Sequence, residues 1–166
     1  MFIRHETDAD HGEIRALNRS AFGGEYEANL VDRLRAEELV RASLVAVDAD
    51  ELVGHILFSA LPVTVDGWCV RAAALAPMAV PPGRQRQGIG SALVWAGLEA
   101  VTAQGFEAVF VLGHPAYYPR FGFSAAVASK LASPYAGDAF MALELIPDAL
   151  RGKSGSVSYP DMFEPD

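Results

Sequence analysis

Residues 81–100, PPGRQRQGIGSALVWAGLEA, mark the point where the chain changes from strand to helix. Two prolines end the apolar segment before them, and after Gly88 apolar residues recur at helical spacing. Gly88 and Gly90 let the backbone come close to a ligand, and the amides and dipole of a helix N-terminus attract negative charge. The stretch therefore predicts an anion-binding loop that runs directly into a helix.

The residues of this loop exclude the two best-known phosphate-binding loops. A P-loop needs a lysine directly after its last glycine, and none follows Gly88 or Gly90. A dinucleotide-binding fingerprint needs glycine or alanine where the chain has Leu93, and the next apolar strand ends without a ribose-binding acid. The remaining pattern, QRQGIG at residues 85–90, fits Q/R-x-x-G-x-G/A and suits a pyrophosphate.

The composition is that of a globular chain of 166 residues, 51% hydrophobic and 20% charged, and predicts one domain over residues 1–166. The N-terminus lacks the apolar core of a signal peptide, and no apolar run approaches the length that spans a bilayer. Cys69 is the single cysteine, and the four histidines lack metal-ligand spacing. We expect a cytoplasmic protein that binds neither metal nor membrane.

Charge is unevenly distributed along this acidic chain, whose net charge is −8. A negative surface is a poor match for nucleic acid, whose phosphates need basic side chains. Residues 1–66 hold 13 acids and six arginines, whereas residues 67–98 hold three arginines and no acid. A buried core with few charges would explain the strands of that window, but Arg84 and Arg86 beside the glycines favour an anion site.

The hydrophobic pattern predicts the order β-α-α-β-β-β-α-β-α-β, with helices covering a mixed sheet. The expected strands cover residues 2–4, 44–49, 52–65, 68–80, 108–112 and 139–145. One expected helix begins at residue 8, a second covers residues 25–38, and a third follows Gly88 and ends at Gly105. Residues 115–120 are expected to form one or two further helical turns.

Two further motifs stand on either side of the loop. Pro77, in the strand LAPMAV at residues 75–80, cannot donate to a sheet ladder, so it predicts a bulge or a separation from the neighbouring strand; an edge strand is the alternative. Further on, residues 117–123 read YYPRFGF and contain the pattern Y-x-x-x-G-F.

Taken together, these motifs resemble the GCN5-related N-acetyltransferase (GNAT) superfamily, and within it the small bacterial group of predicted acetyltransferases called YhbS-like. LAPMAVPPGRQRQGIGSALV and VFVLGHPAYYPRFGF carry the resemblance, which extends loosely over GHILFS at residues 54–59 and GSVSYPDMF near the end, hence nearly the whole chain. It implies an α+β fold (an α/β sandwich) with a mixed, mostly antiparallel sheet, splayed central strands and helices on both faces.

The resemblance also implies a reaction, the direct transfer of acetyl from acetyl-CoA to a primary amine of a small molecule or peptide, without an acyl-enzyme or a metal. The splayed strand, whose backbone would hold the pantetheine arm and polarise the thioester carbonyl, is matched by Met78, Ala79 and Val80. The pyrophosphate loop is matched by Gln85, Arg86, Gln87, Gly88, Ile89, Gly90 and Ser91. Fixed amides aimed at a developing oxyanion stabilise it more than water can.

Tyr118 is the tyrosine of Y-x-x-x-G-F and matches the residue that protonates the departing thiolate. A phenol is protonated at neutral pH and can serve as a general acid. Tyr117 is the alternative acid, and both rings could instead simply pack. The chain departs from the family at Val111, seven residues before Tyr118, where an asparagine that contacts the cofactor is common.

The same resemblance leaves the base and the acceptor open. The sequence offers as base candidates Glu25, Glu27, His55 and His114, and a water chain is the alternative. Because the family's first two helices wall the acceptor site and this half of the chain is acidic, we expect a cationic amine. The chain would act as a monomer or homodimer. The competing hypotheses are a non-catalytic acetyl-CoA sensor or partner module and an unrelated anion binder.

Overall fold

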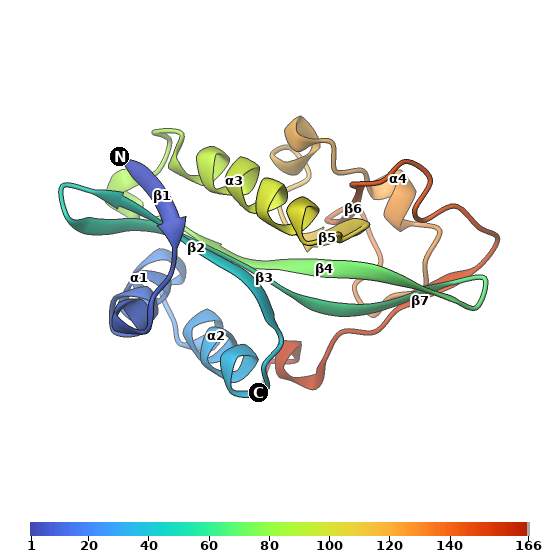
Figure 1. The fold of residues 1–166 in the computed structure, drawn as a ribbon, viewed down its shortest axis with the longest axis horizontal. Helices are drawn as coiled ribbons and strands as arrows, with labels where there is room; N and C mark the ends of the chain where they lie inside the picture. The colour runs from blue at the N-terminus through green and yellow to red at the C-terminus, as the bar shows by residue number, and fades with distance from the viewer. Residues whose placement is uncertain (166) are drawn as a thin grey trace. The chain divides into compact units, whose positions relative to one another are not determined.

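The computed structural model describes residues 1–165, with strands and helices as labelled in Figure 1. The strands are β1 (Phe2–His5), β2 (Val40–Asp48), β3 (Glu51–Val65), β4 (Trp68–Ala79), β5 (Ala108–Leu112), β6 (Phe140–Glu144) and β7 (Gly155–Val157). The α-helices are α1 (His11–Phe22), α2 (Tyr26–Ala36), α3 (Ile89–Ala103) and α4 (Ala125–Ala128). Four 3₁₀ turns join them: η1 (Asp8–Asp10), η2 (Pro82–Arg84), η3 (Tyr118–Phe121) and η4 (Asp161–Phe163).

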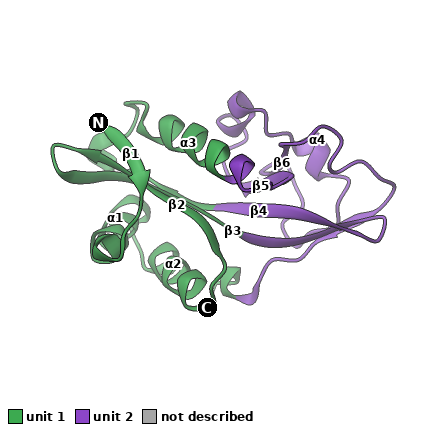
Figure 2. Cartoon of the chain, viewed as in Figure 1, with its two compact units in different colours: residues 1–59, 76–100, 162–166 green, residues 60–75, 101–161 purple. Residues whose placement is uncertain are grey.

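The strands form one mixed sheet in the order β1-β2-β3-β4-β5-β6, with β7 paired to β3. The pairs β1–β2, β2–β3, β3–β7 and β5–β6 are antiparallel, and β4–β5 is parallel. This confirms the expected mixed, mostly antiparallel sheet. The chain divides into two compact units (Figure 2): unit 1 holds residues 1–59, 76–100 and those from Met162 onward, and unit 2 holds residues 60–75 and 101–161.

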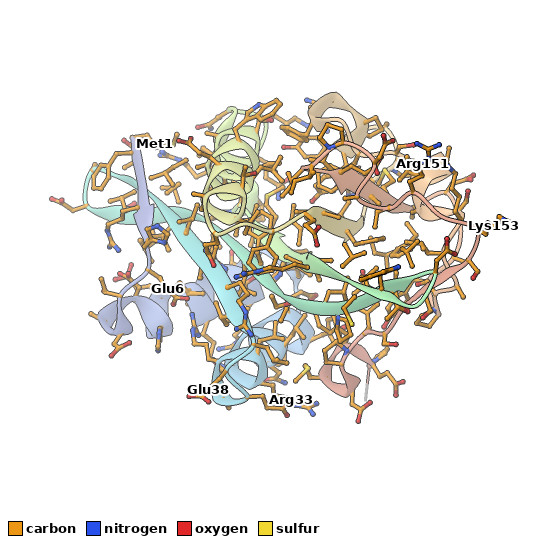
Figure 3. All side chains as sticks on the ribbon, turned by 45° about the vertical axis from the view of Figure 1, so that its right-hand side comes forward. Met1, Glu6, Arg33, Glu38, Arg151 and Lys153 are labelled. Carbon is orange, nitrogen blue, oxygen red and sulfur yellow. The ribbon has the colours of Figure 1, made fainter. Side chains whose placement is uncertain are left out.

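In unit 1, helices cover both faces of the strands. Side chains alternate along β3, so successive residues of this strand face different helices. Gly54 faces α3, since a Cβ added there would lie 2.7 Å from Leu93 Cδ1, whereas the next residue, His55, faces α1 and bonds Asn18. Figure 1 shows α1 and α2 on one side of β1–β3 and α3 on the other. At the outer end of α2, the exposed side chains of Arg33 and Glu38 reach into solvent (Figure 3).

Tight turns set the register of the long hairpins. Ala49 and Asp50 between β2 and β3 both have positive φ, as do Asp66 and Gly67 between β3 and β4. Two consecutive residues with positive φ form the turn whose twist matches a two-residue hairpin. Both turns lie between strands that the sequence predicted, at residues 44–49, 52–65 and 68–80.

Several element boundaries differ from the expectation. The first helix is preceded by the 3₁₀ turn η1, and α2 ends at Ala36 because Glu38 adopts a left-handed conformation with φ of 57°. The strand expected from residue 44 begins at Val40. The tail holds β7, which the sequence did not predict, because three residues of Gly, Ser and Val show no alternation and become a strand only by pairing with Val63–Val65 of β3.

Candidate functional site

The loop predicted to bind an anion leads from β4 into α3 and contains two left-handed residues. Arg86 has φ of 62° and Gly88 has φ of 83°. The first bond of the helix is donated by Ala92 N to Gly88 O, at 3.0 Å. The amides of Ile89 and Gly90 therefore precede the first intrahelical bond and have no acceptor within the helix. A helix start of this kind directs its N–H groups and the positive end of its dipole outward.

Side chains at the base of the loop fix its shape. Gln85 Nε2 donates to the carbonyl oxygen of Val80 at 3.0 Å and so links the loop to the end of β4. Arg84 forms a charge-assisted hydrogen bond with Asp48 in the β2–β3 turn, and this guanidinium lowers the pKa of the Asp48 carboxyl. Arg84 is therefore shared with Asp48, and its expected service to the anion site stays a prediction. Arg86 is exposed and has no ion pair within residues 1–165.

The residues expected to follow a strand separation, Met78, Ala79 and Val80, form the end of β4 and the start of the loop. In unit 2, the parallel pairing of β4 with β5 runs from Ala72 to Leu75 and goes no further, although β4 itself continues to Ala79. Ala79 is 1% exposed and Met78 is half-buried.

Tyr118 lies in unit 2, where it begins η3 after the end of β5. Its ring is buried among aromatic rings, edge-on to Tyr117 at 5.0 Å between centroids and to Phe123 at 5.7 Å. Burial raises the pKa of the Tyr118 phenol above its usual value, because the phenolate would lose its hydration. The Tyr118 hydroxyl is therefore protonated over the whole pH range in which amines react.

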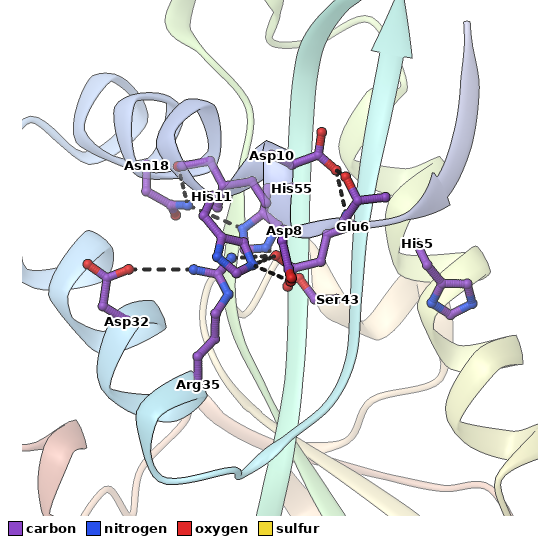
Figure 4. Close-up of polar contacts among 12 residues, drawn as sticks. His5, Glu6, Asp8, Asp10, His11, Asn18, Asp32, Arg35, Ser43 and His55 are labelled. Atoms are coloured by element: carbon purple, nitrogen blue, oxygen red, sulfur yellow. Dashed lines mark hydrogen bonds and ion pairs between the residues drawn. The ribbon is translucent and has the colours of Figure 1, made fainter.

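His55 is removed from the base candidates by its surroundings (Figure 4). The ring is fully buried, Asn18 Nδ2 lies 3.2 Å from Nδ1, and Ser43 Oγ lies 2.8 Å from Nε2. Because an amide nitrogen can only donate, Nδ1 accepts and the proton resides on Nε2, which donates to Ser43. Desolvation, together with the nearby charge of Arg35, lowers the pKa of His55 to about 3. This histidine joins α1, β2 and β3 and is closed to any substrate.

The other three base candidates differ in their partners. Glu25 is ion-paired with Arg15 and Arg19, whose nitrogens lie 2.9 and 2.6 Å from its oxygens. Glu27 is half-buried, and its Oε2 is a buried atom without a hydrogen-bond partner in the part of the chain that the structure describes. His114 is exposed and its carbonyl oxygen accepts from Tyr117 N at 3.0 Å. Glu27 and His114 remain candidates.

No group of three or more potential metal ligands occurs within residues 1–165. Nor is any helix of that range long and apolar enough to cross a bilayer.

Comparison with known proteins places the chain in a family. A family model described as "Acetyltransferase (GNAT) domain" matches residues 2–126. The chain is 38% identical over 166 residues to the uncharacterized N-acetyltransferase YhbS of Escherichia coli K12, with 98% of each chain covered.

Solved structures agree with this assignment. A crystal structure of Escherichia coli YhbS in complex with CoA superimposes with a TM-score of 0.88, covering 98% of this chain and 91% of that one. A GNAT family acetyltransferase from Brucella melitensis in complex with acetyl-CoA is 34% identical, with a TM-score of 0.81, and covers 98% and 97% of the two chains. The expected resemblance and fold are confirmed, and the chain belongs to the GNAT family of acetyltransferases.

Proposed function

We propose that residues 1–166 form one N-acetyltransferase domain that transfers acetyl from acetyl-CoA directly to a primary amine of a small molecule or peptide. The observation that carries this proposal is the loop at residues 85–91, where left-handed Arg86 and Gly88 direct the chain into the N-terminus of α3. The CoA and acetyl-CoA complexes of its relatives support the choice of donor. The proposed setting is the cytoplasm, and the proposed form is a monomer or homodimer.

The donor would be held mainly by backbone groups. The amides of Gly88, Ile89 and Gly90, helped by the positive end of α3, suit the pyrophosphate, with Gln85, Arg86, Gln87 and Ser91 completing the loop. Since Arg84 is paired with Asp48, Arg86 is the cation of this loop available to a phosphate. The backbone of Met78, Ala79 and Val80 would bind the pantetheine arm and polarise the thioester carbonyl, except that Val80 O is already bonded to Gln85.

The chemistry then needs one proton removed and one supplied. The neutral amine attacks the carbonyl carbon, a C–N bond forms, and the C–S bond breaks with its electron pair going to sulfur. Tyr118 donates its phenolic proton to that sulfur, and the proton of the attacking nitrogen leaves to solvent, directly or through Glu27 or His114. A proton from solvent then returns to the Tyr118 oxygen. The raised pKa of Tyr118 keeps the phenol protonated at neutral pH, which is the state that a general acid needs before the reaction.

The variant Tyr118→Phe tests this assignment by removing the hydroxyl while keeping the ring. We expect kcat to fall by about 100-fold or more, the usual contribution of a general acid, with CoA affinity unchanged. Steady-state acetylation and isothermal titration with CoA measure the two quantities. Tyr117→Phe is the matched control: if it loses turnover while Tyr118→Phe does not, the acid is Tyr117.

The two competing functions predict other outcomes in the same experiments. A sensor or partner module would bind CoA but show no acetylation of any amine, and its CoA affinity would not depend on Tyr118. An unrelated anion binder would be stabilised against heat by ATP or NAD as much as by CoA, since any ligand specific for the folded state raises the melting temperature.

A further inference from the structure

Gly113 stands directly after β5, at a position where the backbone does not require glycine. Its N–H donates to Ala139 O at 3.0 Å, which extends the β5–β6 pairing by one residue. It is not among the residues with positive φ, so alanine would be compatible with the backbone conformation. The reason for glycine at this position lies in what a side chain would meet.

A Cβ added to Gly113 would lie 2.4 Å from Cε2 and 2.9 Å from Cδ2 of Tyr118. Carbon atoms in contact normally stay about 3.5–4.0 Å apart, so one of the two groups would have to move. The strand backbone is held by its pairing with β6, and the Tyr118 ring therefore is the group that would be displaced.

The Tyr118 ring has little space into which to move. Three further aromatic rings surround it, Tyr117, Phe121 and Phe123, at centroid distances of 5.0, 6.4 and 5.7 Å. Tyr117 is itself held by Arg120, whose Nε donates to its carbonyl oxygen at 3.0 Å and whose guanidinium lies 4.4 Å from its ring centroid. A displaced ring would have to leave this cluster or push it apart.

The start of η3 is fixed as well. Tyr118 N lies 3.4 Å from His114 O, and the turn closes at Gly122, whose φ is 99° and whose N–H donates to Pro119 O at 3.0 Å. Because the backbone of Tyr118 is anchored, the direction of its hydroxyl is set by the ring position alone.

We propose that Gly113 is a positioning residue: its missing side chain forms the slot that holds the Tyr118 ring with the hydroxyl in the place from which it acts. The inference rests on the proposed role of Tyr118 as proton donor. A hydroxyl displaced by the width of a methyl group would lose its alignment with the departing sulfur, while the donor-binding loop in unit 1 keeps its own structure.

Gly113→Ala is the test, with Gly12→Ala in α1 as the matched control, because a Cβ at Gly12 meets nothing within 4 Å. We expect Gly113→Ala to lower kcat at least tenfold and to leave CoA affinity unchanged. In the Tyr118→Phe background, the same substitution should cause no further loss, because there is no hydroxyl left to misplace. An equal further loss in that background, or a wild-type kcat for Gly113→Ala, overturns the proposal.

A second measurement does not depend on activity. The tyrosinate absorbance of each protein, minus that of the same protein carrying Tyr118→Phe, isolates the ionisation of Tyr118. We expect the difference to appear only above the pH at which an exposed phenol ionises in the otherwise wild-type chain, and at lower pH with Gly113→Ala, as the ring loses its burial. An unchanged titration refutes the displacement. If Tyr118→Phe keeps full turnover, proton donation by Tyr118 is refuted, and the titration alone decides whether Gly113 holds the ring.

Discussion

At the scale of single residues, His55 shows how a histidine that the sequence offers as a candidate base can instead be a structural side chain. Asn18 donates to one ring nitrogen, Ser43 accepts from the other, and no part of the ring reaches solvent. Protonation would place a second donor against Asn18 Nδ2 and a buried charge beside Arg35, whose own partner is Glu6 at 2.6 Å. The neutral ring is therefore part of the folded state.

This buried histidine gives a pH dependence of stability with a defined sign. Its pKa is 6.5 when unfolded and about 3 when folded, so between these values the unfolded chain binds more protons and stability falls as the pH falls. From pH 7 to pH 5 the loss is about 2 kcal/mol from His55 alone. Urea unfolding at both pH values should show this extra loss in the wild type and not in His55→Gln. An equal pH dependence in the two proteins would show that the ring is not held neutral.

At the scale of elements, the contact between α3 and β3 depends on glycine on both sides. Besides Gly54, which accommodates Leu93, the helix residue Gly97 accommodates Phe58: a Cβ there would lie 2.2 Å from Cε2 of a ring that is fully buried. Glycine weakens a helix interior by about 1 kcal/mol relative to alanine, and here that cost allows the close approach.

Gly97→Ala should therefore destabilise the protein although it improves helix propensity. Overpacking a well-packed core costs about 1–3 kcal/mol, which exceeds the gain of about 1 kcal/mol from propensity. Thermal unfolding should show a lower melting temperature for Gly97→Ala and an unchanged or higher one for Gly12→Ala. Adding Phe58→Leu should recover part of the loss. A Gly97→Ala protein as stable as the wild type would mean that Phe58 repacks freely.

The sequence predicted those elements whose signal is local. Gly105, with positive φ, follows the end of the helix that was expected to stop there, and the turns at Ala49–Asp50 and Asp66–Gly67 lie between predicted strands. β7 was missed because it exists only through its partner β3. The 3₁₀ turn η1 was merged with α1, because η1 ends at Asp10 and α1 begins at the next residue, His11.

At the scale of the whole molecule, the candidate site was only partly predictable. Its glycine loop is a local pattern, and so is Y-x-x-x-G-F around Tyr118. Gly113 carried no signal, because its role follows from a ring five residues later that folds back over it. The ion pair of Arg84 with Asp48 could not be predicted, because the two residues lie far apart in the sequence.

Ion pairs within the protein also change what the acidic first half of the chain implies about the acceptor. Five of the 13 carboxylates in residues 1–66 are ion-paired with an arginine: Glu6 with Arg35, Asp32 with Arg15 and Arg35, Asp10 with Arg4, Glu25 with Arg15 and Arg19, and Asp48 with Arg84. Glu27 is different. It precedes buried Leu30, Val31 and Leu34 on one face of α2 and has an unpartnered buried oxygen.

We therefore expect the preference for cationic acceptors to depend on Glu27 more than on net charge. At equal concentration, kcat/KM should rank diamines above neutral monoamines and these above amines that carry a carboxylate. Glu27→Gln should reduce the advantage of diamines about three- to tenfold, as the loss of one partly buried charge pair predicts.

Asp8→Asn, which removes a fully exposed carboxylate, is the control and should leave the ranking unchanged. Because raised salt screens exposed charges more than buried ones, the part of the preference due to Glu27 should persist at high ionic strength. Faster acetylation of anionic amines would contradict a cationic acceptor altogether.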